Sequence, residues 1–123
     1  MKKAIQLAVL LALALGLSAH AADSGPQTFE GEISDSQCAM NVHSLTHSHR
    51  EMLKAKSHGK TSADCVAYCI RYLGGHYMLV SKDDIYHLDN EDLAKSYNAE
   101  KVKVIGYLDK QSKTIQVVKI EPL

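Results

Sequence analysis

Five short strand-like segments, interrupted by one long irregular stretch and one short helix, most constrain what this chain can fold into. In residues 29–33, small or apolar side chains alternate with Glu30 and Glu32, and this two-residue period is typical of a strand with one face in water. The same reading predicts four more strands, over residues 76–81, 85–88, 101–108 and 114–120. The last of them changes parity at Val117-Val118, so we expect a β-bulge there.

The strongest helical pattern covers Thr61 to Leu73. Its apolar residues recur at the spacing of one helix face, and they are Cys65, Val66, Cys69, Ile70 and Leu73. Thr61 or Ser62 is a suitable N-cap, and Gly74-Gly75 ends the pattern. A second, short helix is predicted over residues 91–97.

The order of these elements predicts the fold class. The irregular stretch lies between the first two strands, and the short helix lies between the third and fourth, an order that fits a small OB-type barrel. We therefore expect a mainly β, α+β domain: a five-stranded OB-like barrel with a helical insertion at about residues 37–75. An open antiparallel sheet with helices on one face is the competing fold. Long insertions in compact domains often carry function, and this insertion contains all three cysteines.

The first 21 residues have the pattern of a secretory signal peptide. Lys2 and Lys3 precede an apolar run that is shorter than the roughly 20 residues of a spanning helix, and Ala19-His20-Ala21 is a small-x-small cleavage site. We therefore predict export, to the periplasm or as a secreted protein, with cleavage after Ala21; an N-terminal membrane anchor is the alternative. Residues 22–27 would then form a flexible leader and residues 28–123 a single domain, with no membrane span after cleavage.

The charge of the exported chain disfavours nucleic acid as a partner. The chain of 123 residues has 14 basic and 14 acidic residues. Loss of Lys2 and Lys3 with the signal leaves 12 basic against 14 acidic residues, a net charge of −2. Nucleic acid attracts proteins through a basic surface, and the chain has no basic stripe. The sequence leaves the oligomeric state open.

Three cysteines and one histidine form the most informative chemical set: Cys38, His43, Cys65 and Cys69. Because Cys65 and Cys69 are four residues apart, both thiols lie on one face of the predicted helix. Three thiolates and one imidazole complete a tetrahedral set for zinc, and thiolates also suit a soft metal such as Cu(I). We therefore predict a structural or metal-handling site of the Cys3His type. Three further histidines are candidate auxiliary ligands: His47, His49 and His58.

A disulfide is the alternative use of these cysteines. An exported domain of about 100 residues has a marginal core and often carries a disulfide or a metal. Cys38 could bridge to Cys65 or to Cys69, whereas side chains on a regular helix diverge too far for a bridge between Cys65 and Cys69. The protein would then be a disulfide-stapled OB-like adaptor that binds a protein or glycan partner. Redox catalysis is disfavoured because the chain has no Cys-x-x-Cys pair.

Motifs spread along the chain resemble those of a group of small exported bacterial domains of unknown function. The matching segments are Gly31-Glu32-Ile33-Ser34-Asp35-Ser36-x-Cys38, His43, Cys65-Val66-x-x-Cys69, Gly75-x-Tyr77-x-Leu79-Val80 and Val102-x-Val104-x-Gly106. The likeness covers nearly all of the exported chain, and it implies an OB-type barrel in which the Cys/His set belongs together. It implies no activity. The chain departs from the group at Ala39, where glycine is usual, and in its longer first insertion.

Overall fold

β1 (Gln27–Asp35) is the strand around which the sheet closes. In the computed structural model, which describes residues 25–40, 54 and 59–123, its first part pairs with β4 (Lys101–Asp109) and its last part with β2 (Tyr77–Val80), both antiparallel. The change of partner falls next to Gly31. A Cβ atom on Gly31 would lie 2.5 Å from the carbonyl oxygen of Val80, so glycine is required where these two backbones meet.

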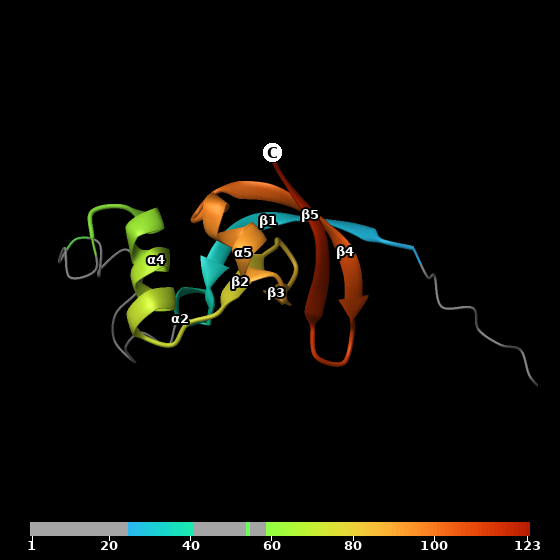
Figure 1. Cartoon of the computed structure of the whole chain (residues 1–123), viewed down its shortest axis with the longest axis horizontal. Coiled ribbons are helices and arrows are strands. Elements are labelled where there is room, and N and C mark those ends of the chain that lie inside the picture. The colour runs from blue at the N-terminus through green and yellow to red at the C-terminus, as the bar shows by residue number, and fades with distance from the viewer. Residues whose placement is uncertain (1–24, 41–53, 55–58) are drawn as a thin grey trace, which may run out of the picture.

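The other two strands complete a ring in the order β1-β2-β3-β5-β4. β3 (Ile85–Leu88) is antiparallel to β2, while β5 (Thr114–Pro122) runs parallel to β3 over a short stretch. β4 and β5 form the long hairpin at the right of Figure 1. The prediction of an α+β domain with five strands in a closed sheet is confirmed, and the open-sheet alternative is wrong. The sheet is mixed and closes unevenly, because the β3–β5 contact is much shorter than the β4–β5 ladder.

The predicted bulge is present in β5. The register steps from Ile105 opposite Lys119 to Gly106 opposite Val117, so Val118 has no residue opposite it on β4. Val118 points outward and is 58% exposed. The extra residue explains why Ile115 and Ile120, which have opposite parity in the sequence, are both buried in the core.

The core fills the ring with side chains that the alternation predicts to point inward. On β4, Val102, Val104 and Gly106 are buried while the residues between them are not. The other strands and α4 add the remaining core residues, which include Ile33, Leu79, Leu88, Ile115, Ile120 and Val66. A helix residue thus packs against the strand core, which fixes the position of that helix on the ring.

Two described helices separate β1 from β2. α2 (Ser36–Ala39) follows β1 directly, and α4 (Ser62–Tyr72) precedes β2. The link from β3 to β4 contains α5 (Glu91–Ala94) and the 3-10 helix η1 (Lys95–Tyr97). Figure 1 shows α4 beside the end of the ring where β1 stops, with α2 next to it. Within the described ranges, no helix has the length and apolar character needed to cross a membrane.

The ends of β1 differ from the sequence prediction. The alternation predicts a strand over residues 29–33 that stops at Ser34-Asp35-Ser36, yet β1 extends from Gln27 to Asp35. Gln27, which the sequence assigns to a flexible leader, pairs with Gly106 of β4. Backbone hydrogen bonds in a ladder do not depend on apolar side chains, so polar residues at both ends of the apolar pattern are recruited into the strand.

Candidate metal centre

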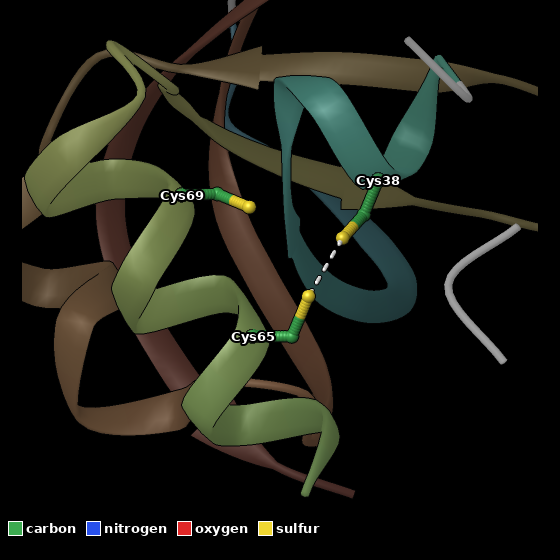
Figure 2. Close-up of side chains that lie close together, drawn as sticks. All are labelled: Cys38, Cys65 and Cys69. Atoms are coloured by element: carbon green, nitrogen blue, oxygen red, sulfur yellow. Dashed lines mark hydrogen bonds between the residues drawn. The ribbon is translucent and has the colours of Figure 1, made fainter. Parts of the chain in front are cut away.

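Three cysteines from two separate helices meet at one point of the structure. Cys38 comes from α2, and Cys65 and Cys69 come from successive turns of α4. Their three Sγ atoms all lie within 4.8 Å of one another, and the Sγ atoms of Cys38 and Cys65 are 3.8 Å apart. Figure 2 shows the three side chains directed into the space between the helices. We refer to Cys38, Cys65 and Cys69 as the thiol cluster.

The position of Cys38 is fixed by Asp35, which ends β1 and caps α2. Its Oδ1 accepts the backbone N–H groups of Gln37 at 2.9 Å and of Cys38 at 3.0 Å, which satisfies amides that the first helical turn leaves unpaired. Ser36 binds the chain just before β2, because its N–H donates to the His76 carbonyl at 2.8 Å and its Oγ accepts from the His76 N–H at 3.0 Å. The turn that presents Cys38 is therefore held from both sides.

The two cysteines of α4 are oriented by its cap and by the core. Thr61 and Asp64 form a reciprocal capping box at the start of the helix. Cys65, Val66 and Cys69 are the buried residues of α4, and Val66 packs into the core of the ring. Burial of this face places both thiols on the side toward α2. The side-chain amide of Gln37 also donates to the carbonyl of Leu73, which ties α2 to the end of α4.

Burial makes the thiols of the cluster difficult to ionise. Cys65 and Cys69 have no exposed surface and Cys38 is partly exposed. Loss of solvation raises the pKa of all three thiols, and the negative charge of Asp35 raises each pKa further. For Cys65, contacts with the other two sulfurs offset part of this rise. Since the thiolate is the reactive form of cysteine, the cluster is a poor nucleophile without a nearby positive charge.

Asp35 is unusual for a helix cap because its side chain is buried and one carboxylate oxygen has no partner among the described residues. Its side chain is fully buried, and only Oδ1 has donors, while Oδ2 has no hydrogen-bond partner in the described part of the chain. Aspartate is rarely buried without a partner. The sequence predicts capping or turn residues at Ser34-Asp35-Ser36, and Asp35 does cap α2. The sequence analysis does not predict that Asp35 is buried next to the thiol cluster. The available signal was the position of Asp35, three residues before Cys38.

The cluster has an opening to solvent on the Cys38 side. Cys38 and Ala39 line a groove of about 570 Å³ between β1, β2 and the C-terminus. Acidic and basic side chains both border it: Glu30, Glu32, Lys82 and Lys101. A site that exchanges an ion needs a path of entry, and this groove leads to the one cysteine of the cluster that is not fully buried.

The predicted site residues divide into two groups. The structure brings together Cys38, Cys65 and Cys69, as the sequence predicts. The four candidate histidines lie outside the described residues, and they are His43, His47, His49 and His58. None of the three cysteines forms a disulfide in this structure, since a bridge needs sulfurs about 2.05 Å apart and the Cys38–Cys65 separation is 3.8 Å. The two sulfurs are in contact, so the oxidised alternative stays a prediction.

Comparison of the chain with models of protein families, with curated proteins and with solved structures finds no match.

Proposed function

We propose that this protein is an exported small metal-binding domain whose thiol cluster holds one borderline or soft metal ion. The observation that carries the proposal is the convergence of the three sulfurs from α2 and α4. With zinc–sulfur bonds of about 2.3 Å, neighbouring sulfurs of a tetrahedral site are about 3.8 Å apart. The Cys38–Cys65 separation of 3.8 Å has this value before any ion is added.

Electrostatics favours a metal over a reactive thiol at this place. The pKa of each cysteine is raised by burial and by Asp35, which opposes the formation of an isolated thiolate. A divalent ion reverses this effect, because its charge stabilises the thiolates that bind it. The same surroundings therefore suppress thiol chemistry and accept a cation.

An ion would also serve the fold. The core of a domain of about 100 residues is marginal, and metals commonly compensate for this. An ion held by Cys38 and by the two cysteines of α4 would join the start of the insertion to its end. We infer a structural role of this kind, together with slow exchange through the groove beside Cys38. His43 remains the sequence-based candidate for a fourth ligand, with His47, His49 and His58 as auxiliary ligands.

Two wider inferences accompany this function. The ring order β1-β2-β3-β5-β4, with a helical link between β3 and β4, supports an OB-type barrel as the finer description of the fold. The apolar run and the cleavage pattern of residues 1–21 support export to the periplasm or the exterior. Both agree with the resemblance to small exported bacterial domains.

The mass of the purified protein tests the metal site directly. We expect native mass spectrometry to show one bound ion per chain and denaturing spectra to show the mass of the fully reduced chain. Thiol counting should then find three titratable cysteines after the ion is removed. A Cys65→Ser variant should carry no ion. A native spectrum without an ion, after zinc and Cu(I) have each been offered to the reduced protein, would end the proposal.

A disulfide-stapled adaptor is the second candidate function. The contact between the Cys38 and Cys65 sulfurs favours it, since a small movement would bring them to bonding distance. A groove of about 740 Å³ along β2, β3 and the β4–β5 turn is the surface that a protein or glycan partner would use. The same mass experiment separates the two functions, because a disulfide lowers the denatured mass by two hydrogens and removes two of the three thiols.

A further inference from the structure

The thiol cluster lies beside a buried carboxylate that the fold does not neutralise. Asp35 has no exposed surface. None of the ion pairs between described residues includes it, and its Oδ2 has no donor in that part of the chain. A buried carboxylate oxygen without a donor costs free energy that a folded protein normally recovers with a hydrogen bond or a cation.

The role of Asp35 as a cap accounts for only half of this side chain. Oδ1 accepts the N–H groups of Gln37 and Cys38, and an exposed serine, threonine or asparagine would cap α2 equally well. Capping therefore explains neither the burial nor the negative charge. A second function of the carboxylate must use Oδ2.

The neighbours of the carboxylate indicate what that function is. Asp35 Oδ1 accepts the backbone N–H of Cys38 at 3.0 Å, so the carboxylate lies beside the cluster at Cys38. Three neutral thiols do not balance a carboxylate. A divalent ion bound to the thiolates would balance it, and it would also supply the partner that Oδ2 lacks.

We propose that Asp35 is the fourth ligand of the metal centre, with Oδ2 on the ion while Oδ1 continues to cap α2. This inference rests on the metal site proposed above and deepens it, because it replaces a Cys3His set with a Cys3Asp set. It also selects the ion. A carboxylate oxygen suits zinc or a similar divalent ion, whereas Cu(I) prefers soft ligands only.

Binding requires a rearrangement around the thiol cluster. The ligand atoms that lie within 4.8 Å of one another are the three sulfurs, and the carboxylate is not among them. Asp35 and the cluster must therefore move closer together to bind one ion. α2 is a single turn of four residues, and it carries both Asp35 at its cap and Cys38. Asp35 is also the last residue of β1, opposite Tyr77, so the two ligands approach the ion by rotation of their side chains.

Asp35→Asn is the decisive variant. Asparagine has the same shape and caps helices as well as aspartate does, but it lacks the charge and is a poor zinc ligand. We expect the zinc affinity, measured by competition with a chromophoric chelator, to fall by about 100-fold or more, since even the loss of a group that only supports a ligand costs about 10–100-fold. Asp109→Asn is the matched control, because this exposed aspartate accepts the Gln111 N–H in the β4–β5 turn, and the substitution should leave the affinity unchanged.

X-ray absorption of the zinc-loaded full-length protein gives a readout that does not depend on any variant. We expect three sulfurs at about 2.3 Å and one oxygen at about 2.0–2.2 Å, without the outer-shell scattering of an imidazole ring. An imidazole signal that disappears in His43→Ala, with unchanged affinity in Asp35→Asn, would overturn the role of Asp35 and leave the metal site standing. Absence of zinc binding by the wild type would instead overturn the proposed function itself.

The melting temperature provides a further test, because the substitution should have different effects without and with zinc. Without metal, Asp35→Asn should melt at the same temperature as the wild type or higher, because the substitution removes an unbalanced buried charge. Addition of zinc should raise the melting temperature of the variant by less than it raises that of the wild type. A variant whose melting temperature rises with zinc as much as that of the wild type would show that Asp35 only caps α2.

Discussion

At the scale of single residues, the raised pKa values of the thiols predict a steep pH dependence of metal affinity. All three thiols are protonated near neutral pH, because burial and Asp35 hold their pKa values above the ordinary value of 9.0. Each thiolate that binds the ion must first release its proton. The affinity should therefore fall as the pH falls, by about tenfold per pH unit for each thiol that ionises, and by about 1,000-fold per unit for all three.

Chelator competition between about pH 6 and pH 8 measures this slope. Cys69→Ala should lower the slope by one proton as well as the affinity, because it removes one of the groups that must ionise. An affinity that does not change with pH would mean that the sulfurs are not the ligands. A step confined to about pH 6–7 would point to histidine ligands in their place.

At the scale of elements, the close approach of β1 to β2, where β1 changes its pairing partner, depends on Gly31. A Cβ atom there would come within 2.5 Å of the Val80 carbonyl oxygen, which belongs to the backbone and cannot swing aside. We expect Gly31→Ala to destabilise the fold by about 1–3 kcal/mol, the usual cost of forcing extra volume into a packed position. Urea denaturation measures the change. Gly25→Ala is the matched control, since a Cβ atom there would meet nothing within 4 Å, and equal effects of the two substitutions would contradict this account.

The strands were the most predictable elements, because burial on one face leaves a period of two residues in the sequence. That period located all five strands and even the bulge at Val118. It could not show the full length of β1, because Gln27 and Thr28 pair through their backbones with β4. α2 could not be predicted from the sequence, because a single helical turn is too short to show a helical period. Its cap residue, Asp35, therefore looks like part of a turn.

The thiol cluster was predictable only in part. The four-residue spacing of Cys65 and Cys69 places both on one helix face, and this follows from local geometry. The approach of Cys38 depends on how β1 ends and on the bonds of Ser36 to His76, which are tertiary contacts. The burial of Asp35 runs against the normal preference of its residue type, so its position three residues before Cys38 was the available signal.

At the scale of the whole molecule, a metal ion in the thiol cluster would couple the insertion to the ring. α2 is continuous with β1, and α4 packs Val66 into the core, so an ion that joins these helices closes the chain between β1 and β2. The unfolded chain has no preformed site, and the free energy of binding therefore adds to that of folding. An ion present at 100 times its dissociation constant adds about 2.7 kcal/mol.

For a domain of this size, that contribution corresponds to a rise in melting temperature of about 10–20 °C. We therefore expect a strong chelator to lower the melting temperature of the zinc-loaded protein by this amount, as followed by circular dichroism. Cys65→Ser should melt at the lower temperature with or without chelator, because it has already lost the ion. The disulfide alternative makes the opposite prediction: a chelator would leave the melting curve unchanged, and a reductant would lower it. The ion and the disulfide would cross-link the same two helices, so the chelator and the reductant, applied separately to the same protein, show which of them holds the insertion in place.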